Sequence, residues 1–484
     1  MTLDADACWR AFRAHDARFD GRFYVGVATT RVYCRPVCRV RAPLRENCRF
    51  FASAAAAEAK GFRPCLRCRP ELAPGHAAID ARSHLAAAAV DLIEGGVLDE
   101  GGVAALARRV GVSDRHLRRL FEAELGVSPI EYAQTHRLLL AKRLLTDTAM
   151  PVTEVAQASG YASVRRFNAS FASRYRMSPS RLRSTLQSRM AGSLDFELAW
   201  RPPYDVEAMF DFLRARALDG VESVGASRYV RTIGVARGAV TLAGRIEVAA
   251  LARRGAFRVS LTPSLAGVVP QVLARVRHLF DLSADPAAVA AALGPLAADR
   301  PGLRVPGTID GFELAVRAIV GQQVSVGAAR TVAARLVAEH GRDLVDGGPG
   351  PARLFPDART IAALPVAAIA RLGIVRRRAE ALRALAAAVD DGSLRLDPGA
   401  DVEATSRRLL ALPGIGAWTA QMIAMRALRW PDAFPAGDLA VRRALGVTSA
   451  SRAEAASGAW RPWRAYAFMH LWARSARSVS RRTG

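Results

Sequence analysis

The sequence predicts a multidomain, mainly α-helical protein with a small α+β domain at the N-terminus and a β-containing segment near the middle. The 484 residues exceed the usual length of one domain. All six cysteines precede residue 69, which sets the N-terminal segment apart from the rest. Strand-like spacing is confined to 23–33 and to parts of 198–285, whereas helical spacing prevails elsewhere.

Composition and charge indicate a globular chain with a polyanionic partner. Hydrophobic residues make up 51%, and Lys+Arg 69 against Asp+Glu 44 gives a net charge of +25. Such an excess favours nucleic acid, although an arginine-rich composition set by genome base content would also produce it. No apolar run has membrane-spanning length and no apolar signal core begins the chain, so we expect no membrane partner and a cytoplasmic location.

Changes in spacing and composition divide the chain into four domains and a linker. They are a cysteine-rich domain over 1–70, a linker with a Pro-Gly turn over 71–84, a helical domain over 85–187, a β-containing subdomain over 198–285 and an all-helical domain over 286–478. A second short join covers 188–198. We therefore expect function to be distributed over several modules.

The cysteines of the first segment form two close pairs, which is typical of a tetrahedral zinc site. The spacing is Cys34-x3-Cys38, then 26 residues, then Cys65-x2-Cys68. Each pair can span one edge of a tetrahedron of thiolates around one Zn²⁺. Most four-cysteine sites are purely structural, so the spacing alone does not indicate catalysis. Cys8 falls outside the pattern, as does Cys48, and neither is expected to bind metal.

The sequence around these cysteines resembles the N-terminal domain of the Ada family. The resemblance is carried by GVATTRVYCRPVCRVRAPLRENCRFF (26–51) and GFRPCLRC (61–68). It implies that Cys34, besides binding zinc, accepts a methyl group from methylphosphotriesters in DNA. Methylating one of four thiolates changes the charge of the site from −2 to −1, which should strengthen DNA binding. The arginines expected near phosphates are Arg35, Arg39, Arg41 and Arg45, for which a solvated surface role is the alternative.

Two similar helix-turn-helix patterns occupy the helical domain. In 103–132, Gly111 makes the turn and Ser113 caps a second helix that carries Arg115 and Arg118. In 152–183, Gly160 and Ser163 have the same roles, before a helix with two adjacent arginines, Arg165 and Arg166. A basic second helix after a glycine turn is suited to a DNA major groove, although a helical bundle without DNA contacts gives the same local pattern.

The doubled pattern resembles the DNA-binding domain of the AraC family, which follows the zinc domain in Ada proteins. The SP endings at 128–129 and 178–179 add to this resemblance. Ada proteins often end in a second methyltransferase with a PCHR motif. This chain has no cysteine after Cys68, so we expect no direct O6-methylguanine repair.

The C-terminal segment contains a helix-hairpin-helix motif, LPGIGAWTA (412–420). Gly414 and Gly416 leave room for main-chain N–H groups to approach a phosphate, and a monovalent cation at the hairpin is a further expectation. A Pro- and Gly-rich loop then leads to Asp438, 22 residues after Gly416. A lone Asp in this position is more often a helix cap than a catalytic residue, but its placement after the hairpin favours catalysis.

This half resembles the AlkA family of 3-methyladenine DNA glycosylases, within the helix-hairpin-helix/Gly-Pro-Asp superfamily. The matching runs are 201–222, 300–326 and 460–473, and the resemblance covers about 198–475. It implies that Asp438 assists base removal and that Trp418 and Trp472 stack on the flipped base, core packing being the alternative for both tryptophans. Trp418 stands where lyase-competent relatives place a lysine, so hydrolysis without lyase activity is expected. The wedge position, usually apolar, holds Gln323, with Gln322 beside it.

Together these features predict an alkylation-damage response protein that combines excision of alkylated bases, methyl acceptance on zinc-bound cysteine and promoter binding. The expected partners are double-stranded DNA and RNA polymerase. One alternative is a glycosylase fused to a DNA-tethering module without transcriptional output. Another is a regulator whose glycosylase fold only binds lesions. Asp438 and the hairpin argue against the regulator, and Cys34 in its motif argues against the tether.

Overall fold

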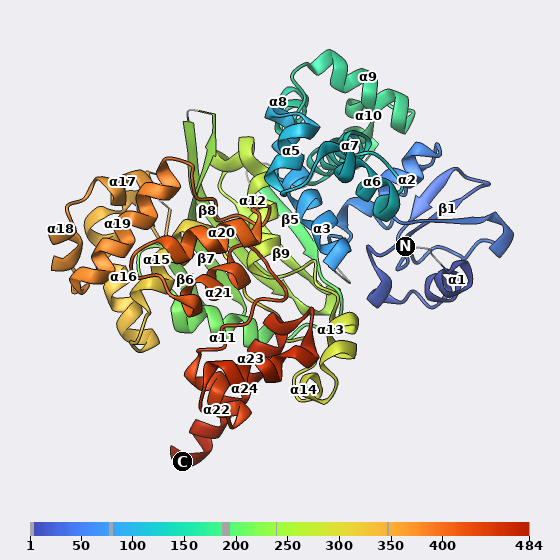
Figure 1. Ribbon diagram of the computed structural model, residues 1–484. Helices are drawn as coiled ribbons and strands as arrows, with labels where there is room; N and C mark the ends of the chain where they lie inside the picture. Colours follow the sequence, from blue (N-terminus) through green and yellow to red (C-terminus); the bar gives the residue numbers. More distant parts are fainter. Residues whose placement is uncertain (1–3, 77–80, 186–193, 239, 346–347, 484) are drawn as a thin grey trace.

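The computed structural model describes residues 4–76, 81–185, 194–238, 240–345 and 348–483. The chain is divided into modules, with the N-terminal domain on one side of a central sheet and the C-terminal helices on the other (Figure 1). This arrangement confirms the predicted multidomain, mainly helical fold. None of the described helices combines the length and the apolar character that a bilayer-spanning segment needs.

The N-terminal module is a small α+β domain built on a four-stranded sheet. The sheet order is β3-β1-β2-β4, with β2 and β4 parallel and the other pairs antiparallel. Cys34 ends β2, and the main-chain N–H of Cys65 donates to the carbonyl of Tyr33 at 3.0 Å. The sheet therefore brings the two cysteine pairs together. Its elements are α1 (Ala5–Arg13), η1 (Ala17–Phe19), β1 (Tyr24–Val27), β2 (Val32–Cys34), η2 (Arg45–Asn47), β3 (Cys48–Phe51), α2 (Ala54–Ala59), β4 (Arg63–Pro64) and η3 (Pro70–Leu72).

The second module contains both predicted helix-turn-helix units. Gly111 (φ +77°) and Gly160 (φ +78°) adopt the left-handed conformation that their turns require. The hydroxyls of Ser113 and Ser163 cap α6 and α9, as predicted. The helices are α3 (Ala81–Glu94), α4 (Val97–Glu100), α5 (Val103–Arg109), α6 (Asp114–Leu125), α7 (Pro129–Asp147), α8 (Val152–Ala158), α9 (Val164–Tyr175) and α10 (Pro179–Thr185).

The segment predicted as a linker, 71–84, is closely packed where it is described. The Glu71 carboxylate is buried and accepts from Lys142 Nζ at 2.6 Å. The Gly75 carbonyl accepts from Arg201 Nη2 at 2.6 Å, and α3 already begins at Ala81. The second predicted join, 188–198, lies partly outside the described residues and otherwise contributes to β5.

The third module is a five-stranded antiparallel sheet of order β5-β9-β8-β7-β6, with one helix between its first two strands in the chain and another after its last strand. Residues alternate between buried and partly buried along β5, as expected for a strand with one face toward a core. The elements are β5 (Leu194–Ala199), α11 (Val206–Arg216), β6 (Glu222–Val224), β7 (Arg228–Arg237), β8 (Val240–Leu251), η4 (Ala252–Arg254), β9 (Ala256–Leu261), η5 (Pro263–Val268) and α12 (Val269–Leu279).

The fourth module is helical, apart from a two-residue β-ladder between β10 and β11. Its elements are α13 (Pro286–Leu293), α14 (Pro295–Ala298), α15 (Gly311–Val320), α16 (Val326–His340), β10 (Arg342–Asp343), β11 (Arg353–Leu354), α17 (Ala358–Ala363), α18 (Val366–Arg371), α19 (Arg376–Asp390), α20 (Val402–Ala411), α21 (Ala417–Arg426), α22 (Leu439–Leu445), α23 (Ala450–Ser457), η6 (Gly458–Trp460) and α24 (Arg464–Thr483).

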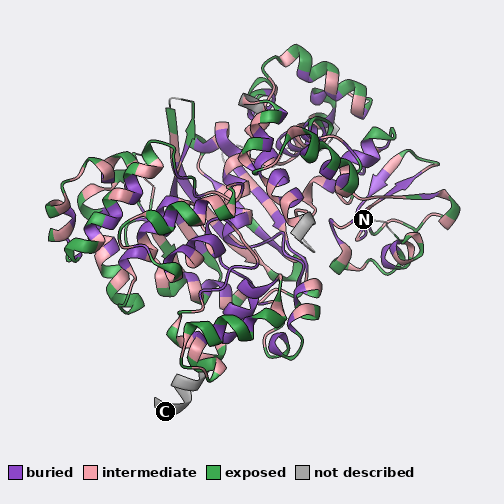
Figure 2. Ribbon diagram, in the orientation of Figure 1, coloured by how far each residue is buried: buried purple, intermediate pink, exposed green. Residues whose placement is uncertain are grey.

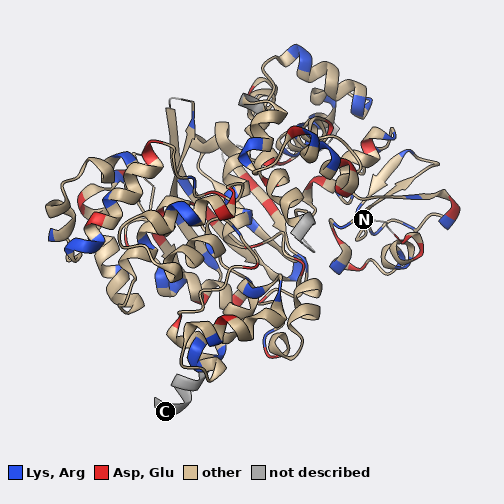
Figure 3. Cartoon of the chain, in the orientation of Figure 1, with Lys and Arg blue, Asp and Glu red and all other residues tan. Residues whose placement is uncertain are grey.

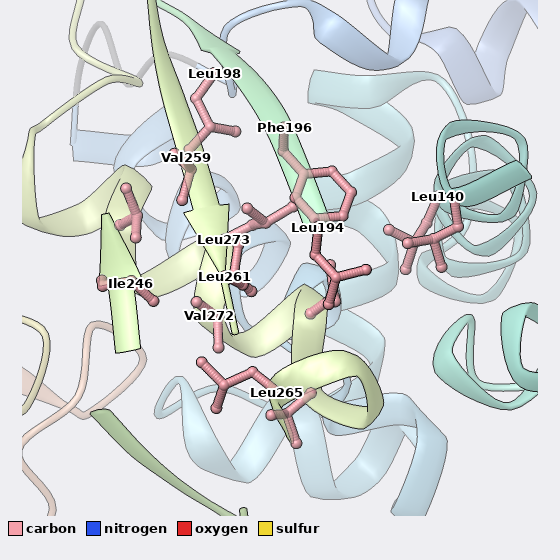
Figure 4. Close-up of a cluster of buried hydrophobic side chains, with 14 of the residues drawn as sticks. Leu140, Leu194, Phe196, Leu198, Ile246, Val259, Leu261, Leu265, Val272 and Leu273 are labelled. Atoms are coloured by element: carbon pink, nitrogen blue, oxygen red, sulfur yellow. The ribbon is translucent and has the colours of Figure 1, made fainter. Parts of the chain in front are cut away.

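The largest hydrophobic core crosses a module boundary. Buried residues are concentrated in the central sheet and on the helix faces toward it (Figure 2). Leu140 of α7 belongs to the same buried cluster as Phe196 of β5 and Leu273 of α12 (Figure 4). Because this shared core removes apolar surface of both modules from water, the helix-turn-helix domain and the sheet are held together.

Candidate functional sites

The four cysteines form one site. Their sulfur atoms, Sγ of Cys34, Cys38, Cys65 and Cys68, all lie within 4.8 Å of one another. Four sulfurs that each lie about 2.3 Å from a central Zn²⁺ would have comparable separations, so the cluster fits tetrahedral coordination. Cys8 and Cys48 are buried outside this group, as the spacing predicted. The chain therefore has a site suited to one Zn²⁺.

Main-chain N–H groups donate hydrogen bonds to cysteine sulfurs of the cluster. Arg35 N donates to Cys68 Sγ at 3.3 Å. The main chain also donates to Cys38, from Val40, and to Cys65, from Cys68. A hydrogen bond of this kind favours the thiolate form of the sulfur that accepts it.

The arginines near the cysteines differ in accessibility, which corrects part of the prediction. Arg35 is buried, forms an ion pair with Asp20 and donates to the Cys68 carbonyl at 3.2 Å, so it supports the site from inside. Arg45 is half-buried, lies over the Phe50 ring at 5.2 Å and pairs with Asp6. Arg39 and Arg41 are exposed. These two are the arginines free to meet a phosphate without rearrangement.

Purified protein is expected to contain one zinc ion per chain. Replacing Cys38, Cys65 or Cys68 by Ser should remove it, because three thiolates leave the tetrahedron incomplete. The measurement is metal analysis by mass spectrometry, with Cys48→Ser as the control because Cys48 is buried outside the cluster. Unchanged zinc in the three ligand variants would disprove the assignment.

The second helices of both helix-turn-helix units present basic side chains to solvent. Arg115 and Arg118 are exposed on α6, and Arg165 and Arg166 are exposed on α9. Arg118 pairs with Asp114 at 2.7 Å within the same helix. Basic side chains are also distributed over the other modules (Figure 3). The structure thus exposes the arginines predicted to contact DNA.

The hairpin between α20 and α21 has the geometry that its glycines predict. Gly414 has φ +75°, and a Cβ there would lie 3.1 Å from the Ala381 Cβ, so this position requires glycine. Gly416 is the N-cap of α21, and a Cβ there would meet nothing within 4 Å. Gln322 fastens the hairpin to the α15–α16 turn, since its Nε2 donates to the Gly414 carbonyl at 3.0 Å and to Thr419 Oγ1 at 2.9 Å.

Gln323 differs from Gln322 in its surroundings. Its side chain is exposed and its backbone has φ +55°, a conformation unusual for a residue with a side chain. It lies in the turn that the hairpin holds through Gln322. Such a residue is presented outward from a fixed turn, which is compatible with the wedge position implied by the sequence resemblance.

The structure brings Asp438 and Trp418 into direct contact. Trp418 Nε1 donates to Asp438 Oδ2 at 3.2 Å. Asp438 is also the N-cap of α22, where Oδ1 accepts from the N–H groups of Ala440 at 2.9 Å and Val441 at 3.2 Å. The carboxylate is therefore fixed at both oxygens. Asp438 therefore caps α22 and contacts Trp418 at the same time, so its interpretation as a helix cap does not exclude its interpretation as a site residue.

Both residues line a cavity of about 290 Å³. Trp472 of α24 lines it from another side, and Phe212 of α11 lies against Trp472 with 5.9 Å between the ring centroids. The Arg216 guanidinium lies 3.9 Å from the Phe212 ring centroid and 4.8 Å from that of Trp472. The cavity therefore has aromatic walls, a carboxylate and a stacked guanidinium.

Ion pairs neutralise the other carboxylates that line the cavity. Glu222 and Glu313 both contact Arg231 and Arg317. Burial disfavours the charged form of Glu222, but the two arginines prevail and lower its pKa to about 2. Arg426 also lines the cavity, and burial lowers its pKa to about 9. Glu222 is thus not suited to donate a proton at neutral pH.

Sequence reasoning missed Phe212, Arg216 and Gln322 as residues of this site. Phe212 and Arg216 are four residues apart, so they lie on the same face of α11. Both fall within the run 201–222 that carries the resemblance to glycosylases, which was the available signal. Their closeness to Trp472, more than 250 positions along the chain, depends on the tertiary fold.

The C-terminal half of the chain, which contains the hairpin and the cavity, has no lysine. The two lysines of the chain are Lys60 and Lys142, and both belong to the N-terminal half. Because a Schiff base requires a neutral amine, borohydride is expected to trap no covalent enzyme–DNA adduct during base removal. The measurement is gel electrophoresis of reduced reactions, with a lyase-active glycosylase as the positive control. A trapped adduct would reveal lyase chemistry at another amine, such as the N-terminus.

Four family models match the chain in order. They are the metal binding domain of Ada (residues 7–71), a helix-turn-helix domain (106–185), the AlkA N-terminal domain (195–310) and the HhH-GPD superfamily base excision DNA repair protein (316–458). Fold and sites thus define a DNA-repair protein that joins an Ada-type metal-binding domain, a helix-turn-helix domain and an HhH-GPD domain.

The similarity to known proteins extends over nearly the full length of the chain. The chain is 40% identical to the "Probable bifunctional transcriptional activator/DNA repair enzyme AlkA" of Mycobacterium tuberculosis, over 98% of this chain and 97% of that protein. It belongs to that family. It is 39% identical to DNA-3-methyladenine glycosylase 2 of Escherichia coli, over 57% of this chain and 96% of that protein. The 3-methyladenine DNA glycosylase of Archaeoglobus fulgidus shares the fold (TM-score 0.50, 21% identity, 58% of this chain and 98% of that one).

Proposed function

We propose that the chain is an alkylation-damage response protein whose glycosylase half removes alkylated bases by hydrolysis at Asp438. The observation that carries this proposal is the contact of Asp438 with Trp418 at the wall of a cavity of about 290 Å³. A base flipped out of the duplex needs such an enclosed, aromatic-lined space. The ionised carboxylate stabilises positive charge that develops on the sugar as the glycosidic bond breaks, and orients water.

The cavity favours bases that already carry positive charge. Removal of a neutral purine is helped by a general acid, yet Glu222 is held ionised by arginines and Glu313 forms ion pairs with the same arginines. An N-alkylated purine leaves as a neutral base and needs no such proton. Trp418 offers its ring to this cation, whereas Arg216 already covers part of Trp472. N-alkylated purines are therefore the proposed substrates.

The N-terminal half adds a stoichiometric methyl transfer. A methyl group of a methylphosphotriester is attacked by Cys34 Sγ, an S–C bond forms as the O–C bond breaks, and the phosphodiester leaves as an anion. Zinc keeps the four sulfurs deprotonated at neutral pH. Cys34 is the proposed acceptor because it is the first cysteine of the motif that resembles the Ada family. Only 3% of Cys34 is exposed, so the transfer requires local movement at the DNA surface.

Promoter binding by α6 and α9 completes the proposed function. RNA polymerase is the proposed partner in activation, tested by transcription from a bound promoter with purified polymerase. The alternative, a DNA tether without transcriptional output, predicts promoter binding and no increase in transcripts. We also propose that hairpin carbonyls hold a monovalent cation. The Gly414 carbonyl already accepts from Gln322, so the other hairpin carbonyls would supply the ligands, and DNA affinity independent of K⁺ or Na⁺ identity would disprove it.

One experiment tests the whole proposal. Full-length protein is incubated with DNA that carries N-alkylated purines, and base release is measured beside promoter affinity before and after exposure to methylphosphotriester DNA. Base release with a methylation-dependent gain in affinity is expected. Base release without a gain in promoter affinity would favour the alternative of a glycosylase fused to a DNA tether. Lesion binding without base release would favour a regulator whose glycosylase fold is inactive.

A further inference from the structure

The helix-turn-helix domain contacts the glycosylase domain at two points that bracket the catalytic segment. This segment consists of α20, the hairpin and α21, and the loop that follows it leads to Asp438. One contact point lies at 397–401, just before α20, and the other at 429–430, just after α21. A cavity of about 540 Å³ lined by residues of both points lies between the two domains. The segment is therefore held at its two ends.

At the first point, α3 and α5 pack on the turn that precedes α20. Arg109 Nη2 pairs with Asp397 Oδ2 at 2.9 Å. A Cβ at Gly399 would collide with the Leu92 side chain, which shows how closely α3 approaches. The α5–α6 turn approaches Asp401, the N-cap of α20, since a Cβ at Gly111 would lie 2.9 Å from Asp401 Oδ2. The start of the hairpin's first helix is thus in contact with the DNA-binding domain.

At the second point, α3 holds the residues with which the loop to Asp438 begins. The Asp91 carboxylate pairs with the Arg429 guanidinium, and both side chains are only 21% exposed. About two turns earlier on α3, His84 packs edge-on against Trp430 with ring centroids 5.3 Å apart. Arg429 has φ +59°, an unfavourable backbone conformation that persists only where its surroundings fix it. Asp91 is part of those surroundings.

Asp91 is the carboxylate available to Arg429 at this point. Two other acids lie near the guanidinium, and both have partners of their own. Asp281 accepts from Tyr466 Oη at 2.8 Å. Glu94 pairs with Arg277 at 2.8 Å. An Arg429 without Asp91 would be a partly buried cation without a direct carboxylate partner, and it would be expected to change position.

From these contacts we propose that Asp91, in the helix-turn-helix domain, is a positioning residue for base excision. It acts through Arg429, which fixes the start of the loop that ends at Asp438. The inference rests on the proposed glycosylase function. A displacement of a catalytic group by a fraction of an ångström is enough to slow a reaction, so loss of this ion pair slows the chemical step while the DNA-contacting hairpin stays intact.

The test uses the full chain and its Asp91→Asn variant. The readouts are the single-turnover excision rate at saturating enzyme, the Kd for lesion DNA and the thermal unfolding temperature. We expect the rate to fall roughly tenfold, within the range of about 2- to 30-fold for couplings of this kind, with Kd changed less than twofold. Asp91→Glu, which keeps the charge, should recover part of the rate and gives a second measurement where Asp91→Asn folds poorly.

The matched control is Arg22→Gln. Arg22 pairs with Asp285 at 3.2 Å, so this variant also breaks an ion pair between an N-terminal module and the glycosylase half, but away from the catalytic segment. Its excision rate should equal that of the wild type. An Asp91→Asn rate within twofold of the wild type, or an equal fall in Arg22→Gln, would overturn the inference. Absence of excision in the wild type itself would instead refute the proposed glycosylase function.

Discussion

Asp438→Asn is expected to abolish base release while leaving the affinity for lesion DNA nearly unchanged. Loss of the negative charge removes the stabilisation of positive charge on the sugar, a contribution on the order of 10²- to 10³-fold in rate. Asn is also a good N-cap, so its oxygen can keep the bonds to the N–H groups of Ala440 and Val441. Its amide nitrogen would then face Trp418 Nε1 without an acceptor, at a cost of about 1 kcal/mol in stability. The measurement is single-turnover excision beside a binding titration.

Asp357→Asn provides the matched control for this variant. Asp357 is the N-cap of α17 and accepts from Thr360 N at 2.8 Å, so the same chemical change is made at a cap remote from the cavity. Its excision rate should be that of the wild type. Wild-type excision by Asp438→Asn would reduce Asp438 to a helix cap and would remove the catalytic proposal.

Exposure to methylphosphotriester DNA is expected to tighten promoter binding and to steepen its dependence on salt. Methylation of Cys34 takes the zinc site from two net negative charges to one, beside the exposed Arg39 and Arg41. One added effective phosphate contact changes the slope of log K against log salt by about −0.9. The measurement is a salt titration of promoter affinity for methylated and unmethylated protein.

Two variants make this result specific. Cys34→Ala should show no response to the methyl donor, although its base excision through Asp438 should continue. Arg39→Gln with Arg41→Gln should lower the affinity in both states, because these arginines supply the phosphate contacts in the proposal. Equal affinities and slopes before and after methylation would leave Cys34 as a plain zinc ligand. Mass-spectrometric mapping of the methyl group to another cysteine would reassign the acceptor.

Local sequence rules predicted much of the fold. Glycine turns and serine caps located both helix-turn-helix units, because φ > 0 and an N-cap hydroxyl are requirements that a few residue types meet. The spacing of the cysteines predicted the four zinc ligands, because tetrahedral coordination by two close pairs is also a requirement that few residue patterns meet. The cysteines are close in space because β2 and β4 pair, and the short spacings restrict how each pair can meet a metal.

Tertiary packing determined the side-chain positions and long-range contacts that the sequence alone did not predict. Arg35 resembled its exposed neighbours in the sequence, yet Asp20 lies beneath it and draws it inside. Arg216 showed no pattern of its own, and its place between Phe212 and Trp472 depends on how α11 meets α24. The contacts of α3 with 397–401 and 429–430 join segments more than 300 residues apart, a separation that no local rule reaches.

The scarcity of lysine gives an experimental opportunity. Of the two side-chain amines, Lys142 is only 2% exposed and is engaged by Glu71, whereas Lys60 lies in the exposed end of α2. An amine-reactive fluorophore at mildly alkaline pH should therefore label the zinc domain at Lys60, apart from the α-amino group, without touching either the hairpin or the cavity. A dye placed there would report the approach of the zinc domain to DNA in real time, with all six cysteines left unmodified.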